Sequence, residues 1–287
     1  MSDIRVGRAL RRSAAIRAVR AAQANRFGMI ASSIAFFSFL ALLPLLGAIT
    51  FAYGMFTEPE QVVQDVRSLV QVLPGNARQL VGSWLVETIT DPKGRGLGLL
   101  LSTTLAFYSA MRAGQSVIAG LNVAGGVEGG RGFFGQRAAS LLMVLSGSAL
   151  ILTALFALSA LAFLERLVPQ GYSTLVPLLR TIFWSVATIG AGVALLLIYR
   201  YAPAREPPSF RRVAPGAVCA TLAWLAATVA FGFYLGSFGP YQRTYGSLGA
   251  VIVLQIWLFL SAYTMLLGAA LNAELERSGG DGGGHSR

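Results

Sequence analysis

The sequence predicts an all-α membrane protein, a polytopic bundle of six transmembrane helices with both termini in the cytoplasm. Of its 287 residues, 55% are hydrophobic and 12% are charged, which is about half the charged share of an ordinary soluble domain. The hydrophobic residues are gathered in blocks long enough for a helix to cross a bilayer. This composition excludes an ordinary soluble enzyme.

Six mainly apolar runs are the predicted spans, at about 28–55, 96–115, 138–164, 181–199, 213–237 and 248–271. The first is too long for the core of a signal peptide and is expected to remain as an anchor. The second is the weakest, because Arg112 interrupts it before a further uncharged segment at 113–127. This helix either continues toward the cytoplasm or carries Arg112 inside the membrane, so five or seven crossings are the alternatives.

The distribution of Lys and Arg predicts the orientation, because these residues are enriched in cytoplasmic segments. Sixteen of them lie in the segments expected inside, 1–27, 112–137, 200–212 and 272–287. Seven lie in the segments expected outside, 57–95, 165–180 and 238–247. The predicted domains are a basic cytoplasmic N-terminus (1–26), a six-span membrane domain (27–273) and a disordered cytoplasmic tail (274–287).

The arginine-rich N-terminus leaves no clean apolar face at helical spacing, and no aromatic residue stands among its arginines to stack on bases. We interpret it as a topology signal near the cytoplasmic leaflet rather than a nucleic-acid arm or an anionic-lipid patch. The first outer segment, 57–95, contains two stretches with apolar residues at helical spacing. These predict a pair of amphipathic helices that cap a cavity, lie at the interface or pack against the spans.

Arg112 is the most informative charge, because charged side chains inside a membrane are costly and often mark a substrate site. On a continuing helix, Arg112, Gln115 and Asn122 share one face. With Glu128, they are the candidate substrate-binding residues, and Arg112 is expected to hold an anionic head group. The alternative is that Arg112 extends to the cytoplasmic interface as an ordinary cation at a helix end.

Two features of the spans concern backbone geometry. Pro44 lies inside the first span, where it removes one backbone hydrogen bond and is expected to kink the helix. Gly232 and Gly236 form a G-x-x-x-G pair, which is suited to close contact between membrane helices. Glycine is abundant in this chain, so this second signal is weak.

Catalytic signatures are absent from the sequence. It has no phosphate-binding loop of the G-x-x-x-x-G-K-[ST] type, and its single histidine, His285, lies in the tail. With Cys219 as its single cysteine, it has no Cys/His zinc site. We therefore expect no enzyme activity, no cofactor and no metal.

Three stretches carry a family pattern: 31–38 continuing to Pro44, the loop 121–128, and 238–252 with the span end that follows it. They resemble the YihY/virulence factor BrkB family over about residues 25–277. The resemblance implies a six-span protein of the bacterial inner membrane. Members were once labelled ribonuclease BN, but this sequence offers no nuclease site.

The family motifs add further candidate residues. The outer turn of the last motif supplies residues that could gate a path or act as ordinary interfacial anchors, namely Tyr241, Arg243, Tyr245, Gly246 and Ser247. The end of the last span supplies Asn272 and Glu274. The chain departs from the family where Phe36 and Phe37 replace common tyrosines and where Ala270 replaces a common glutamate.

The leading functional hypothesis is a transporter that moves an amphiphilic or lipid-like substrate between leaflets. The alternatives are an ion-coupled exporter of small solutes or cation antiporter, and a membrane scaffold for envelope assembly that transports nothing. The expected partners are membrane lipids and an amphiphilic substrate, with no nucleic acid.

Overall fold

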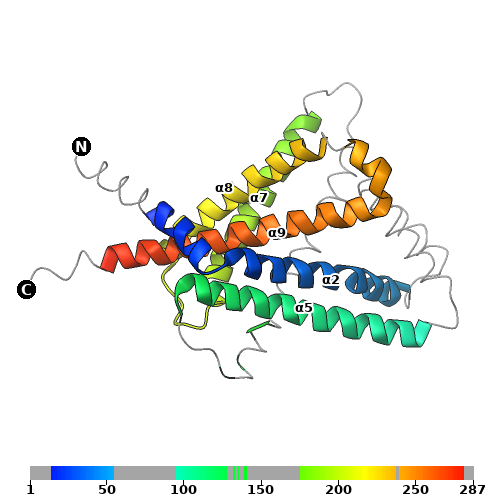
Figure 1. The fold of residues 1–287 in the computed structure, drawn as a ribbon, viewed down its shortest axis with the longest axis horizontal. Helices are drawn as coiled ribbons and strands as arrows, with labels where there is room; N and C mark the ends of the chain where they lie inside the picture. Colours follow the sequence, from blue (N-terminus) through cyan, green and yellow to red (C-terminus); the bar gives the residue numbers. More distant parts are fainter. Residues whose placement is uncertain are drawn as a thin grey trace, which may run out of the picture. The chain divides into compact units, whose positions relative to one another are not determined.

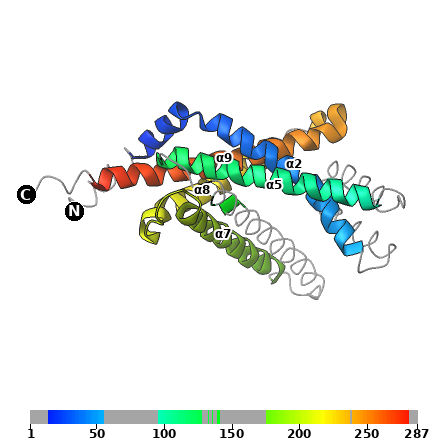
Figure 2. The same ribbon diagram turned by 90° about the horizontal axis from the view of Figure 1, so that it is seen from below.

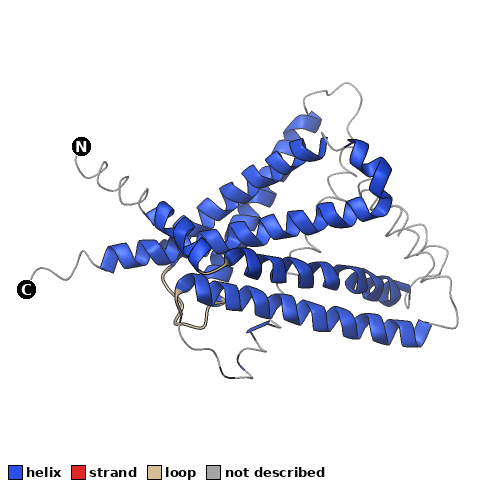
Figure 3. Ribbon diagram, viewed as in Figure 1, coloured by secondary structure: helices blue, strands red, loops and turns tan. Residues whose placement is uncertain are grey.

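The computed structural model describes residues 14–54, 95–127, 132, 135, 139–140, 175–236 and 239–280. Every regular element in these residues is a helix, as Figure 3 shows. A helix at Ala14–Ala24 is followed by the labelled helices of Figure 1. These are α2 (Phe27–Gly54), α5 (Arg95–Gly125), α7 (Leu175–Tyr201), α8 (Phe210–Gly236) and α9 (Gly239–Gly280). The predicted all-α class is confirmed for the described residues.

The helices match five of the predicted spans with changed ends. The first, fourth, fifth and sixth predicted spans lie in α2, α7, α8 and α9, and the second lies in α5. Helix α5 continues past Arg112 to Gly125. The span predicted at 138–164, apart from residues 139–140, and the amphipathic helices predicted in 57–95 lie outside the described residues.

Three helices of the described chain are long and apolar enough to cross a membrane, at Thr181–Tyr201, Phe210–Tyr234 and Val251–Ser278. A fourth crossing is formed if Ala14–Ala24 and Phe27–Leu42 count as one broken span. Helix α5 is not among the candidate spans found in the described residues. The count of six crossings and the cytoplasmic termini stay predictions.

The chain bends by 71° between the helix Ala14–Ala24 and the start of α2, a turn that can be followed in Figure 2. Arg26 at this bend adopts the left-handed conformation, with φ of 53°. One face of the preceding helix is buried at Ala14, Ala18 and Ala22. A narrow stripe of methyl groups at four-residue spacing is therefore enough for this helix to pack.

Contacts divide the chain into two compact units. Unit 1 comprises Met1–Gly28, Val117–Leu225 and Tyr263–Arg287, and unit 2 comprises Met29–Ser116 and Ala226–Ala262. Helices α5, α8 and α9 therefore contribute segments to both units.

The core of unit 1 is a close approach of α8 and α9. A Cβ atom added at Gly268 would lie 2.6 Å from the Gly216 carbonyl oxygen and 2.7 Å from Ala220 Cβ. A Cβ atom added at Gly216 would overlap the Gly268 carbonyl oxygen and the Asn272 side chain. Small residues on both helices thus let the two backbones touch. Helix α7 joins them through Tyr199, whose hydroxyl donates to the Met265 carbonyl oxygen at 2.6 Å.

Unit 2 contains the first part of α5 and most of α2. The hydroxyls of Ser33 on α2 and Ser116 on α5 lie 3.1 Å apart and share a hydrogen bond. Helix α2 buries small apolar residues at helical spacing, including Ala31, Ile34 and Ala35. The helix continues through Pro44. No atom of the described residues lies within 4 Å of a Cβ atom added at Gly232, so the described part of the chain makes no close contact at this glycine of the G-x-x-x-G pair.

Candidate functional site

The polar residues of unit 1 gather where four segments meet: the helix Ala14–Ala24, the end of α5, the connection 202–209 and the end of α9. We call this cluster the polar junction. Its members are Arg17, Asn122, Arg205, Asn272, Glu274 and Glu276.

Asn122 connects the end of α5 to the 202–209 connection. Its side-chain Oδ1 accepts a hydrogen bond from the Ala204 backbone N–H at 2.8 Å. One turn later α5 ends in a Schellman motif, in which Gly126 N–H bonds to the Val123 carbonyl oxygen and Val127 N–H to that of Asn122. Gly126 takes the left-handed conformation that this cap requires, with φ of 62°.

Asn272 connects α9 to the first turns of α8. Its Oδ1 accepts from the Gly216 backbone N–H at 2.7 Å, and its Nδ2 donates to the Val213 carbonyl oxygen at 3.0 Å. Pro215 lies between these two backbone groups, inside α8. A proline within a helix lacks an N–H, and the Asn272 amide bonds to the backbone on both sides of this one.

Three ion pairs involve the carboxylates at the end of α9. Arg205 donates from both terminal nitrogens to Glu276, at 2.8 and 3.2 Å. Arg17 donates from Nε to Glu274 at 2.9 Å, and Arg277 donates to the same carboxylate at 2.6 Å. The Glu274 side chain is 9% exposed, so two arginines compensate one buried carboxylate.

These contacts explain why the chain is helical where a disordered tail was expected. Helix α9 continues to Gly280, through the first part of the predicted tail 274–287. The pairing of Glu274 and Glu276 with arginines from other segments holds these last turns in place.

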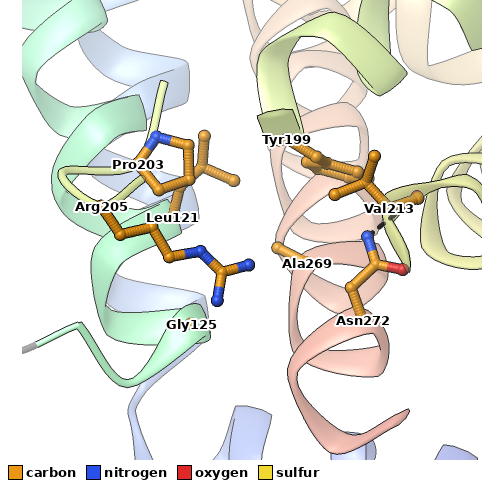
Figure 4. A pocket seen from close by; sticks show the side chains of 8 residues that line it. All are labelled: Leu121, Gly125, Tyr199, Pro203, Arg205, Val213, Ala269 and Asn272. Atoms are coloured by element: carbon orange, nitrogen blue, oxygen red, sulfur yellow. Dashed lines mark hydrogen bonds between the residues drawn. The ribbon is translucent and has the colours of Figure 1, made fainter. Parts of the chain in front are cut away.

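A small cavity of about 20 Å³ lies inside unit 1. Its lining comprises Leu121, Gly125, Tyr199, Pro203, Arg205, Val213, Ala269 and Asn272. Figure 4 shows the Arg205 side chain extending from its connection toward Ala269 and Asn272. Arg205 Nε is buried without a hydrogen-bond partner among the described residues. The cavity has room for about one water molecule, so it is too small for an amphiphile.

The substrate-binding candidates Arg112, Gln115 and Asn122 all lie on α5. Of these, Asn122 already bonds to Ala204. Arg112 is exposed; its Nε donates to the Tyr108 hydroxyl at 3.2 Å, and its guanidinium lies 5.3 Å from the centre of that ring. Gln115 is half-buried, and Glu128 lies outside the described residues.

The segment predicted as an outer turn forms the first turns of α9, which begins at Gly239. Pro240 directly after this start favours a helix, because proline is well suited to the first helical positions. The structure describes the backbone of this segment. It does not describe the side chains of Tyr241, Arg243, Tyr245 and Ser247 or the surroundings of Gly246.

Sequence reasoning missed Arg17, Arg205 and Glu276 as parts of one cluster. Arg17 and Glu274 are 257 positions apart, and Arg205 and Glu276 are 71 apart. The charge count did assign all of their segments to one side of the membrane, and that was the available signal. Among the described residues, no group of three or more His, Cys, Asp or Glu side chains could hold a metal.

Long apolar helices, buried small residues at the helix contacts and arginines gathered at helix ends define a helical membrane protein. The chain belongs to the virulence factor BrkB family, whose model matches residues 18–286. This confirms the resemblance found in the sequence.

Several named relatives are similar to this chain. YfkH of Bacillus subtilis (strain 168), which its name describes as ribonuclease-like, is 32% identical over 254 residues, covering 86% of this chain and 89% of YfkH. A UPF0761 membrane protein of Xanthomonas campestris pv. campestris (strain B100) is 39% identical over 93 residues, covering 32% of this chain and 22% of the relative. The UPF0761 protein XAC0937 of Xanthomonas axonopodis pv. citri (strain 306) matches to the same extent. No solved structure matches.

Proposed function

We propose that this membrane protein is a transporter rather than an enzyme, and that it moves an amphiphilic, lipid-like substrate between leaflets. The observation that carries the proposal is Arg112. It is an exposed cation in the interior of the long helix α5, and it forms no ion pair with any described residue. A cation in that position is costly unless an anion comes to it.

The surroundings of Arg112 suit an amphiphile. Tyr108 accepts a hydrogen bond from Nε of the guanidinium, and the terminal nitrogens, which bond to no described residue, can donate to a phosphate or carboxylate. The same helix exposes large apolar side chains, among them Leu101 at 70% and Phe107 at 56%. Helix α5 therefore carries both a cation that suits an anionic head group and exposed apolar side chains that suit an acyl chain.

Buried hydroxyls lie on the same helix. Ser109 is fully buried, and its Oγ has no hydrogen-bond partner among the described residues. Ser116, two turns along, shares a hydrogen bond with Ser33 of α2. An unpartnered polar atom in a buried position is unusual, and a passing head group would supply the missing partner.

We also propose that the protein lies in the bacterial inner membrane with both termini in the cytoplasm. Contacts within unit 1 support a common side for the four segments rich in arginine. Arg17 pairs with Glu274, Asn122 bonds to Ala204, and Arg205 pairs with Glu276. These pairs link all four segments that the charge count assigned to the cytoplasm.

A second candidate function, ion-coupled transport, is favoured by a different observation. Thr228 Oγ1 and Gln255 Oε1 of unit 2 are buried oxygens without hydrogen-bond partners in the described part of the chain. Neutral oxygens of this kind are ligands for alkali cations. Under this alternative, flux in proteoliposomes requires an imposed ion gradient, whereas leaflet exchange of lipid does not.

The test is lipid exchange in proteoliposomes, measured as the loss of fluorescence from head-group-labelled lipid when a membrane-impermeant reductant is added. Removing a charge-assisted hydrogen bond by Arg112→Gln should slow exchange by about tenfold or more, and Arg112→Lys should retain part of the rate. Arg20→Gln, which removes another exposed arginine, is the matched control. Exchange that is unchanged in Arg112→Gln would refute the assigned role.

A further inference from the structure

The connection between α7 and α8 lies at the expected level of lipid head groups. It joins the candidate spans Thr181–Tyr201 and Phe210–Tyr234 through residues 202–209 alone. Two adjacent helices that cross a bilayer must both leave the hydrocarbon at such a short connection. Tyr201 and Phe210, about half exposed, stand at the two span ends, which is where aromatic residues concentrate at membrane interfaces.

This connection carries unpaired positive charge. Arg211 and Arg212 at the start of α8 are exposed, and neither forms an ion pair with a described residue. The neighbouring Arg205 is already neutralised by Glu276. Glu206 is exposed and carries the one opposing charge in the connection. The start of α8 adds the positive end of a helix dipole.

Arg200 gives the same surface a fixed cation. Its guanidinium carbon lies 4.0 Å from the centre of the Phe210 ring and 5.3 Å from that of Tyr201. The rings orient the guanidinium by cation–π attraction. Its Nε is buried and makes no hydrogen bond to a described residue. The surface therefore combines three arginines with two exposed aromatic rings.

The connection is held in shape before any ligand arrives. Its backbone is tied to α5 by the hydrogen bond from Ala204 N–H to Asn122, and to α9 by the Arg205–Glu276 pair. Pro203 is buried, and Pro207 and Pro208 restrict the backbone further. A preformed surface loses little conformational entropy on binding.

We propose that this surface, formed by Arg200, Tyr201, Phe210, Arg211 and Arg212, is a binding site for the phosphate of an anionic phospholipid. Arg211 and Arg212 donate to the phosphate oxygens, while the two rings lie against the glycerol and the upper acyl chain. The site lies within unit 1 and uses none of the residues assigned to the transported substrate. It is a lipid site separate from the one proposed at Arg112.

The experiment uses the full chain in mild detergent and native mass spectrometry to count bound short-chain phosphatidylglycerol. Arg211→Gln combined with Arg212→Gln should lower lipid retention by about tenfold or more, since each interfacial arginine contributes to anionic-lipid binding. Arg211→Lys with Arg212→Lys should restore most of it. The matched control, Arg20→Gln with Arg26→Asn, removes the same charge from exposed positions, and Asn tolerates the left-handed backbone at position 26.

Two further probes separate the sources of phosphate. Phosphatidylcholine should be retained weakly by every variant, because its head group has no net charge. Inorganic phosphate should leave phosphatidylglycerol bound. Equal loss in the control, equal retention of phosphatidylcholine, or displacement by inorganic phosphate would each overturn the proposal. Retention that is lost only in the Gln pair, while lipid exchange by that variant continues, would support it independently of the Arg112 assignment.

Discussion

Asn272 joins α9 to α8 through both ends of one buried amide. Its side chain makes hydrogen bonds to the Gly216 N–H and the Val213 carbonyl oxygen, and the residue is 3% exposed. Because it leaves the Gly216 N–H and the Val213 carbonyl oxygen without this side-chain partner, Asn272→Ala should lower the free energy of unfolding by about 1–3 kcal/mol. Thermal unfolding in detergent, followed by circular dichroism, measures this change.

Two further variants sharpen that test. Asn272→Asp keeps an acceptor for the Gly216 N–H but turns an oxygen toward the Val213 carbonyl, so we expect it to be destabilised too. Asn25→Ala is the control, because Asn25 is exposed and its side chain makes no hydrogen bond to a described residue; its effect should stay within about 0.5 kcal/mol. An Asn272→Ala protein that unfolds at the same temperature as the parent protein would contradict the bridging role.

The sequence identified single residues where chemistry made them conspicuous. Arg112 stood out as a charge within an apolar run, and Asn122 and Asn272 stood out through family motifs. Arg17 and Arg205 did not, since each is one of many arginines and its partner is distant in the chain. Ion pairing across such separations depends on how helix ends are brought together, which no local pattern records.

At the scale of helices, the contact of α8 with α9 depends on the absence of two side chains. A Cβ atom at Gly268 would lie 2.5 Å from the Tyr199 hydroxyl and would also crowd Gly216. Gly216→Ala and Gly268→Ala should therefore each destabilise the protein by about 1–3 kcal/mol or more, because overpacking forces the helices apart.

Gly232→Ala is the matched control for both variants. It lies in the same helix as Gly216, and no atom of the described residues is within 4 Å of the added methyl group. Alanine is the better helix former, so this variant should be neutral or more stable. Thermal unfolding of the three variants side by side tests the assignment; a Gly216→Ala protein as stable as Gly232→Ala would show that the two backbones do not touch.

Hydropathy located the helices well and their ends and contacts poorly. The apolar runs predicted α2, α7, α8 and α9 because a membrane span must satisfy its own backbone hydrogen bonds. The span predicted at 96–115 ended ten residues short of α5, whose end is set by the Gly126 cap. The G-x-x-x-G motif indicated Gly232, whereas the close contact uses Gly216 and Gly268 on different helices. Spacing within one helix does not say which face meets a partner.

At the scale of the whole chain, charge and contact give the same grouping. The excess of arginine assigned four separate segments to one side of a membrane. In unit 1, hydrogen bonds and ion pairs link the helix Ala14–Ala24, the end of α5, the connection 202–209 and the end of α9. Segments that touch cannot lie on opposite sides of a bilayer, so the proposed topology requires an even number of crossings between each segment and the next.

This grouping predicts the labelling pattern of engineered cysteines. Cys219 is the one native cysteine, so Cys219→Ala gives a cysteine-free background. Three exposed residues are then replaced in turn by cysteine. Ala15→Cys lies in the helix Ala14–Ala24, Gly132→Cys follows the end of α5, and Ser209→Cys lies in the connection 202–209. In intact cells a membrane-impermeant maleimide should leave all three unlabelled, and in inverted membrane vesicles it should label all three. Labelling of one position from the opposite side to the others would refute the shared side. Labelling of all three in intact cells would support the shared side of the segments but place that side outside the cytoplasm.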